Sequence, residues 1–240
     1  MLFTGVMNHR ASVTHRTWMI VLVSAAVIGT LVAAITLGPI LLRSVPTVAA
    51  AGWRGWFGTI NGAMLLTLAA LPLAALAVWL LARCRKALGE AFAWRLSLAD
   101  VGLVYGTLPW VWGALVRDGD DGTLPARVNL VPLNDLAAIF TATPLTITVQ
   151  IVGNLLVFAA VGFFGPIRFA ALASIPRIAI LAAGCSILLE VAQYVLRLGR
   201  VSSVDDVLLN TLGAALAALL SRPWWRLTPG TPATPSVLGH

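Results

Sequence analysis

Acidic and amide side chains stand in two apolar segments near the carboxyl end of the chain, and they are the residues best suited to chemistry. Glu190 and Gln193 belong to the first segment, and Asp205, Asp206 and Asn210 to the second. Inserting a carboxylate into hydrocarbon costs about 2.5–3.5 kcal/mol of free energy on insertion scales. Such a side chain therefore needs an interaction partner or has a functional role. The chemistry open to these residues is hydrogen bonding to a ligand or general acid–base catalysis.

The composition excludes an ordinary soluble domain. Hydrophobic residues make up 59% of the 240 positions and charged residues only 10%, whereas soluble domains have about 25% charged residues. The net charge is +7, but the basic residues stand singly or in small groups between apolar runs. That placement is typical of membrane-topology signals rather than of nucleic-acid binding. We therefore expect the lipid bilayer as a partner and no nucleic acid.

Neither cysteine nor histidine indicates a metal or a cofactor. Cys84 and Cys185 are far apart in the sequence, and nothing pairs them. The three histidines, His9, His15 and His240, lie in terminal segments. We therefore expect no cofactor, no metal site and no histidine-based catalysis in the membrane.

Six apolar runs predict an all-α protein, a polytopic bundle of about six transmembrane helices. The first run, residues 17–42, is longer than the roughly 7–15-residue apolar region of a cleaved signal peptide. The fourth run should begin at Pro144 and end at Gly165-Pro166, and the fifth has a first-turn proline at Pro176. The six predicted spans are residues 17–42, 55–82, 101–116 (extendable to 98), a part of 136–167, 176–196 and 203–221.

An even number of spans places both termini on one side, and the basic residues indicate which side. Ten of the 16 Lys and Arg residues fall in the termini and the two connections on their side. The positive-inside rule then predicts cytoplasmic termini in a bacterial cytoplasmic (inner) membrane. The loop 117–144 and the turn 198–204 lie together on the outer face in this topology. The tail, residues 223–240, is rich in Pro, Thr and Gly and is expected to be disordered.

Helical spacing gathers the polar side chains into two stripes, one on each of the last two predicted helices. The link between the helices, residues 197–202, is short, so we expect antiparallel neighbours whose stripes face each other. Asn154, in the fourth span, also needs an internal hydrogen-bond partner. The first stripe contains Ser186, Glu190 and Gln193, and the second contains Ser203, Asp206, Asn210 and Gly213.

Two interpretations of these stripes compete. In the structural one, amide groups and Arg200 satisfy the carboxylates and fix helix packing, and we favour it for Asn154 and Asn210. In the functional one, Glu190 and Asp206 line an outward-facing site, which we favour because intramembrane acids usually mark a site.

Three smaller expectations accompany these two interpretations. Asp205 points about 100° away from Asp206 and could cap its own helix. Ser186 is expected to bond Glu190, one helical turn away. The glycines expected to allow close helix approach are Gly153, Gly162 and Gly213.

Four motifs in order and spacing resemble the VanZ-like family of bacterial membrane proteins, over about residues 98–222. The resemblance implies a four-helix membrane domain at residues 97–222, preceded by a two-helix extension, residues 1–96. The matching residues are Asn129-Leu130-Val131-Pro132; Gly153-Asn154 with Phe158 and Gly162; Ser186, Glu190 and Gln193; and Gly199-Arg200 followed by Asp205-Asp206, Asn210, Thr211 and Gly213.

The chain departs from the family pattern at three positions. Leu133 stands where the family often has Phe, and Ala160 where it often has Pro. Ser203 replaces an aspartate, which argues against a three-aspartate metal site. The resemblance implies a link to teicoplanin-type resistance through the family's namesake, and no established enzyme class.

Our leading hypothesis is an outer-face polar pocket that binds a cell-envelope lipid or a glycopeptide-type ligand and contributes to antibiotic resistance. Asn129 and Arg200 would orient the ligand, and Glu190 and Asp206 would supply acceptors. The alternative is a membrane-embedded acid–base enzyme acting on an envelope lipid or peptidoglycan precursor, with Glu190 and Asp206 as its candidate catalytic residues. Ion-coupled transport and a purely structural or assembly role remain further readings.

Overall fold

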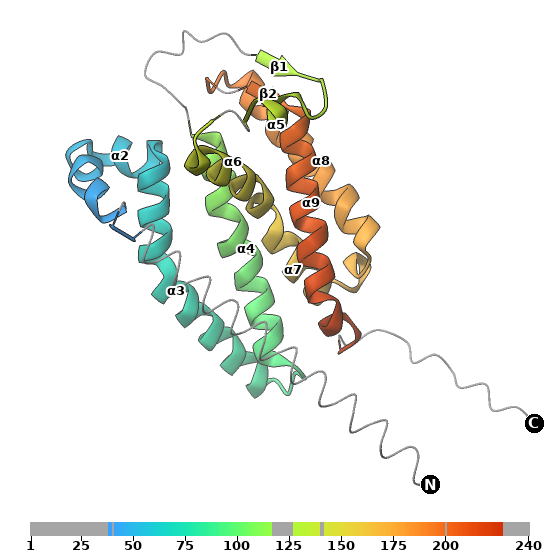
Figure 1. The fold of residues 1–240 in the computed structure, drawn as a ribbon. Coiled ribbons are helices and arrows are strands. Elements are labelled where there is room, and N and C mark those ends of the chain that lie inside the picture. The colour runs from blue at the N-terminus through green and yellow to red at the C-terminus, as the bar shows by residue number, and fades with distance from the viewer. Residues whose placement is uncertain (1–37, 40, 117–126, 140–141, 200, 228–240) are drawn as a thin grey trace, which may run out of the picture.

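The computed structural model shows a bundle of helices with a very small sheet at one end (Figure 1). It describes residues 38–39, 41–116, 127–139, 142–199 and 201–227. The predicted all-α bundle is confirmed. Most of the first predicted span, and residues 117–126 of the predicted outer loop, fall outside the described residues.

The described helices follow one another with short connections. A helix at Leu41–Ala50 precedes the labelled elements. Those elements are α2 (Gly52–Gly58), α3 (Ile60–Ala87), α4 (Ala93–Leu115), β1 (Arg127–Asn129), α5 (Asn134–Ile139), α6 (Pro144–Val157), α7 (Ala159–Arg168), η1 (Ala170–Leu172), α8 (Ile175–Val195), β2 (Val201–Ser203), α9 (Val204–Ser221) and η2 (Arg222–Leu227).

The second predicted span begins later in the structure than the sequence indicated. Thr59 has an extended backbone and its hydroxyl accepts from the Gly62 N–H at 3.0 Å, which caps α3 and ends the short α2 before it. Helix α3 then continues to Ala87, past the basic residues that the prediction took as its end. A threonine cap in an apolar run gives little sequence signal, because threonine is also common inside membrane helices.

The last three predicted spans agree closely with the structure. Helix α6 begins at Pro144 behind an N-cap at Thr143, as predicted, and α7 continues its path. The predicted end at Gly165-Pro166 is wrong by two residues, because Pro166 lies inside α7 and the helix ends at Arg168. Helices α8 and α9 match the predicted fifth and sixth spans to within about a residue at each end. The prediction of a disordered tail is wrong for residues 223–227, which belong to η2, and residues 228–240 lie outside the described residues.

Within the described residues, four helices are long and apolar enough to cross a membrane: Ile60–Ala87, Thr146–Arg168, Ile175–Val195 and Val204–Trp225. Helix α4, the third predicted span, begins at Ala93, five residues before the earliest start predicted for it, and has 23 residues. That length suffices for a bilayer. Its tryptophans, Tyr105 and Asp100 lower its mean hydropathy below that of the other four.

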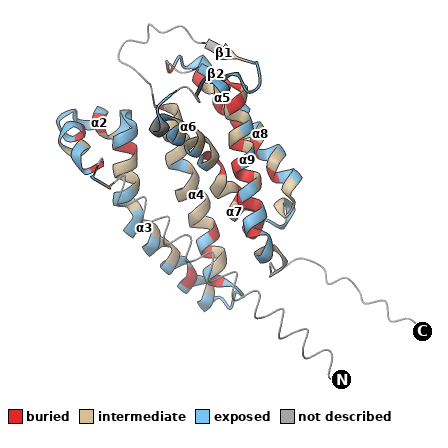
Figure 2. Ribbon diagram, viewed as in Figure 1, coloured by how far each residue is buried: buried red, intermediate tan, exposed pale blue. Residues whose placement is uncertain are grey.

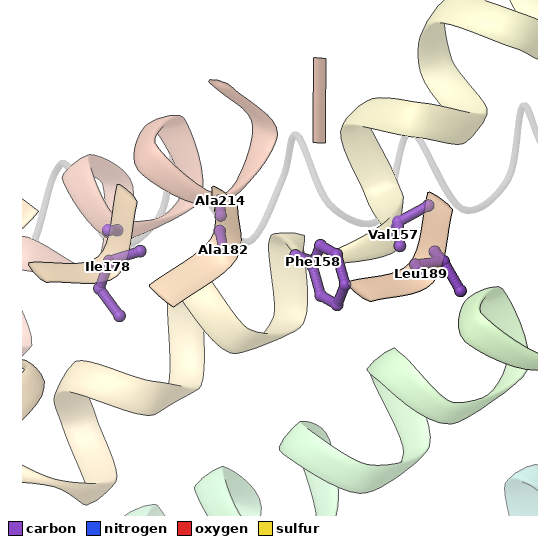
Figure 3. Close-up of a cluster of buried hydrophobic side chains, with 7 residues drawn as sticks. Val157, Phe158, Ile178, Ala182, Leu189 and Ala214 are labelled. Carbon is purple, nitrogen blue, oxygen red and sulfur yellow. The ribbon is translucent and has the colours of Figure 1, made fainter. Parts of the chain in front are cut away.

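Packing is concentrated in one half of the bundle. Buried residues gather on α7, α8 and α9, whereas α3 is largely exposed or intermediate (Figure 2). The core cluster joins the α6–α7 junction to α8 and α9 (Figure 3). Large apolar side chains such as Leu73, Ile180 and Leu188 are about 70% exposed, as expected where lipid replaces water. The core residues are Val157, Phe158, Ile178, Ala182, Leu189, Ala214 and Ala218.

Two of the three predicted close-approach glycines do bring helices together. A Cβ on Gly162 would lie 2.0 Å from the carbonyl oxygen of Ala214, and one on Gly213 would lie 2.0 Å from that of Leu155. Backbones therefore meet directly between α7 and α9 and between α6 and α9. The expectation for Gly153 is wrong, since nothing lies within 4 Å of a Cβ placed there.

The loop after α4 and the turn before α9 meet at the end of the bundle. Strands β1 and β2 pair in parallel, with Arg127 opposite Val201 and Asn129 opposite Ser203. This pairing brings the Asn-Leu-Val-Pro loop to the amino end of α9 (Figure 1). The predicted proximity of the two segments is confirmed in the described residues.

Candidate functional site

Glu190 holds β2 against α8. Its Oε2 accepts a 3.0 Å hydrogen bond from the backbone N–H of Ser203, and its backbone carbonyl accepts one from the Ser202 hydroxyl at 3.0 Å. Glu190 is 8% exposed, so its carboxylate lies inside the protein rather than in lipid. The two stripes therefore face each other, as predicted, and Glu190 meets the backbone that leads into α9.

Asp205 fixes the loop that follows β1. Its two carboxylate oxygens accept from the backbone N–H groups of Leu133, at 2.5 Å, and Leu136, at 3.0 Å. These N–H groups belong to the amino end of α5, where an anion also complements the helix dipole. The expectation that Asp205 caps its own helix is wrong. Ser203 is the N-cap of α9, and its hydroxyl accepts from the Asp205 N–H.

Asn129 shapes the same loop from inside. Its Oδ1 accepts from the Val131 N–H at 3.1 Å, and its Nδ2 donates to Asp135 at 2.6 Å. The first bond is an Asx turn, which holds a tight reversal without a glycine. Beyond it, Leu130 and Val131 are 72% and 62% exposed. The loop is thus held firmly at its base and presents apolar side chains at its tip.

Asp206 and Asn154 form the link between α9 and α6. The Asn154 Nδ2 donates to Asp206 Oδ1, which supplies the internal partner predicted for Asn154. Both side chains are only partly buried. Asp206 also makes a further interaction.

Ser186 and Asn210 pair deeper in the bundle. The Asn210 Nδ2 donates to the Ser186 hydroxyl at 2.7 Å, and both residues are almost fully buried. The expected bond between Ser186 and Glu190 is therefore replaced by one across the helices. The Asn210 Oδ1 is buried and has no hydrogen-bond partner among the described residues.

Gln193 turns toward a different helix from the one expected. Its Nε2 donates to the Ala114 carbonyl oxygen at 3.0 Å, which ties α8 to the end of α4. An amide donor to a backbone carbonyl is an ordinary way to fasten membrane helices. Gln193 therefore belongs to the packing of the bundle beneath the loop.

The structure brings most of the predicted site residues together at the end of the bundle where β1 and β2 pair. Arg200 lies outside the described residues. Sequence reasoning missed Ser202, Asp135 and the backbone N–H of Leu133. Ser202 lies in the paired strand β2, and Asp135 lies six residues after Asn129. These positions are the only signal for the two residues, and they become meaningful once the pairing of β1 with β2 is known. No group of three or more His, Cys, Asp or Glu among the described residues could hold a metal ion.

Exposure separates the cluster into two sets with different chemical possibilities. Glu190 and Asp205 are buried and bonded to backbone N–H groups. Asp206, Asn129 and Asn154 are partly exposed. Only the second set combines polar atoms with access to an outside molecule. The cluster can thus offer carboxylate and amide oxygens as acceptors beside an exposed apolar loop.

Long apolar helices, lipid-facing leucines and buried polar links between helices define the chain as a helical membrane protein. The family described as VanZ/LLP1 matches residues 101–226, just over half of the chain. The chain therefore belongs to the VanZ-like family, as its motifs predicted. No curated protein and no solved structure matches it.

Proposed function

We propose that this chain is an integral protein of the bacterial cytoplasmic membrane that binds a cell-envelope lipid or a glycopeptide-type ligand at its outer face. The observation that supports the proposal is the polar cluster beneath an exposed apolar loop. Partly exposed Asp206, which bonds Asn154, follows Asp205, and Asp205 holds the base of that loop. In the loop, Leu130 is 72% and Leu133 60% exposed.

The chemistry of the cluster defines the class of ligand. Carboxylate and amide oxygens accept from hydroxyl, amine or amide N–H groups, while Leu130, Val131 and Leu133 offer contact to an acyl chain. A lipid or lipoglycopeptide has both parts in one molecule. Asp206, Asn154 and Asn129 would contact the ligand, whereas Glu190 and Asp205 would position β2 and the loop. A contribution to lowered glycopeptide susceptibility belongs to the same proposal.

The test is ligand-dependent stability of the purified chain in detergent. An envelope-lipid extract, or teicoplanin in a parallel arm, should raise the melting temperature of the wild type. Asp206→Asn should lose that rise while its melting temperature without ligand changes little. Glu90→Gln is the matched control, because it removes one exposed carboxylate (45% exposed) from α3–α4 and not from the cluster. An equal ligand response in wild type and Asp206→Asn would contradict the proposal.

The hydrogen bonds of the cluster favour a second candidate, a structural or assembly role. The carboxylates of Glu190 and Asp205 both accept hydrogen bonds from backbone N–H groups. In that case Glu190→Gln and Asp206→Asn should both lower stability, and neither the extract nor the antibiotic should stabilise the wild type. The response of the wild type to ligand is therefore enough to distinguish the two candidates, and the melting temperature of Asp206→Asn without ligand distinguishes them a second time.

A further inference from the structure

Two short helices fold back on the start of α3. The backbone of Thr59 is extended and separates α2 from α3. A Cβ on Gly62 would lie 2.1 Å from the Gly55 carbonyl oxygen, whereas a continuous helix would place these two residues about 10.5 Å apart. A Cβ on Gly55 would in turn lie 2.1 Å from the Val48 carbonyl oxygen. Helix α2 therefore packs closely against both α3 and the preceding helix, Leu41–Ala50.

A contact with α4 fixes the level of α2 along the bundle. The Trp112 indole N–H donates to the Phe57 carbonyl oxygen at 3.1 Å, and the two rings stack with their centroids 5.5 Å apart. Trp112 stands three residues before the end of α4. Figure 1 shows α2 beside the start of α3, at the end of the bundle that also has β1 and β2. Helix α2 has only 7 residues, and neither it nor Leu41–Ala50 approaches the roughly 20 residues that cross a bilayer.

The side of α2 away from its packed glycine presents aromatic rings. Gly55 is buried, and Trp53 lies about 200° away from it around the helix axis. Trp53 is 71% and Phe57 52% exposed, and their spacing of four residues puts them on one face. In the preceding helix, Leu42 is 70% exposed. Indole rings favour the boundary between lipid headgroups and acyl chains, so this face fits a membrane surface.

Two arginines give the same element a positive charge. Arg43 and Arg54 are exposed, and the Arg54 guanidinium lies 5.6 Å from the centroid of the Trp53 ring. The sequence has no Asp or Glu before Glu90, and the ion pairs found among the described residues include neither arginine. Their charges are therefore available to lipid phosphates. Short helices that combine exposed aromatic rings with arginine are typical of segments that lie on a membrane surface.

We propose that α2 and Leu41–Ala50 form an interfacial element that binds the headgroup layer of an anionic phospholipid leaflet, on the side of the membrane where β1 and β2 lie. Trp53 and Phe57 enter the boundary with the acyl chains, and Arg43 and Arg54 contact phosphates. The predicted topology makes that leaflet the outer one. The proposal is independent of the ligand cluster on α6 and α9, and residues 41–58 precede the family match at residues 101–226.

The test is the membrane depth of a fluorescent label on the full chain, in vesicles of equal parts phosphatidylglycerol and phosphatidylcholine. The label is attached at Gly58→Cys, the last residue of α2, where a Cβ meets nothing within 4 Å. Gly184→Cys is the matched control, because it is equally open and lies midway along α8. Both variants also contain Cys84→Ser and Cys185→Ala, so that the added cysteine is the one labelled.

Lipid spin-labelled at its headgroup should quench the Gly58→Cys label more strongly than lipid spin-labelled deep in its acyl chain. The order should be reversed for Gly184→Cys. Three results would overturn the proposal. Stronger quenching by aqueous iodide than by either lipid would place α2 in water. The same depth at both positions would place α2 inside the bilayer. Weak quenching by all three agents would show that another part of the chain, or a second copy, covers this face.

A second measurement does not require the cysteine variants. Lipid brominated near its headgroup should quench part of the tryptophan fluorescence of wild type, and Trp53→Phe should reduce the quenched part. Trp79→Phe, near the other end of α3, removes a tryptophan of similar kind (44% exposed) and serves as the control. Equal reductions in the two variants would contradict a special contact of α2 with lipid.

The contribution of charge is tested with the same Gly58→Cys label. Arg43→Gln and Arg54→Gln should each lower the ratio of lipid-bound to water-exposed α2 about fivefold, the effect of one basic side chain near an anionic surface. Arg222→Gln, an exposed arginine after α9 at the opposite end of the bundle, should leave the ratio unchanged. An unchanged ratio in both of the first two variants would overturn the contact with lipid phosphates.

Discussion

Asp205, in the first turn of α9, receives the backbone N–H of Leu133 at 2.5 Å across 72 residues of chain. Leu133 has a φ of +64°, in the left-handed region that non-glycine residues seldom adopt. The buried carboxylate therefore holds a strained turn in place at the base of the exposed loop. This contact joins the Asn-Leu-Val-Pro motif to the Asp-Asp motif, and together the two motifs hold the loop against the start of α9.

Replacing Asp205 should loosen the loop more than replacing its neighbour. Asp205→Ala leaves two backbone N–H groups without their acceptor, which should cost about 2–4 kcal/mol of unfolding free energy. Residues 127–139 should become sensitive to limited proteolysis. Asp206→Asn serves as the control, because it removes the same charge from the same helix terminus without touching the loop. Equal protease sensitivity of the two variants would refute this role.

Substituting Leu133 should relieve strain rather than create it. Leu133→Gly removes the steric cost of the left-handed conformation, which stabilises the folded state by roughly 1–2 kcal/mol. Glycine also makes the unfolded chain more flexible, which destabilises the folded state by about 0.5–1 kcal/mol. The side chain is 60% exposed, so little packing is lost. We expect a melting temperature equal to or above that of wild type. Leu133→Val, with a β-branched side chain at positive φ, should melt below both, and the reverse order would be inconsistent with a strained turn.

The close contacts of α9 should make two glycines intolerant of a methyl group. Gly162→Ala and Gly213→Ala would place a Cβ against a carbonyl oxygen, so the helices must separate at a cost of about 1–3 kcal/mol or more. Gly184→Ala, in α8, meets nothing within 4 Å. It should gain up to about 1 kcal/mol from helix propensity. Thermal unfolding in one detergent measures all three, and a stable Gly213→Ala would be evidence against direct backbone packing.

Asp100 should matter far more than the other carboxylate near Arg85. Asp100→Asn leaves Arg85 and Arg168 without their shared counter-ion. The cost should be about 1–3 kcal/mol, below that of a fully buried pair because Asp100 is 29% exposed. Glu90→Gln, 3.4 Å from Arg85 and 45% exposed, should cost under about 1 kcal/mol. Chemical denaturation of both variants at low and high salt tests the ranking, and equal losses would contradict it.

The sequence by itself determined the helical membrane fold and the family. Long uncharged runs require helices in a bilayer, since each backbone polar group must be satisfied within its own segment. Local signals placed Pro144 at the start of α6 and Ser203 at the start of α9. They also placed the polar residues of α8 and α9 on facing stripes, because helical periodicity fixes which side chains share a face.

The partners of those polar residues were decided only by the tertiary structure. Asp205 bonds Leu133, Gln193 bonds Ala114, and Ser186 bonds Asn210. Each pairing depends on which helices are neighbours and at what height they cross, and periodicity within one helix holds no such information. The same is true of Asp100, which is shared by Arg85 of α3 and Arg168 of α7 only because α4 packs against both helices.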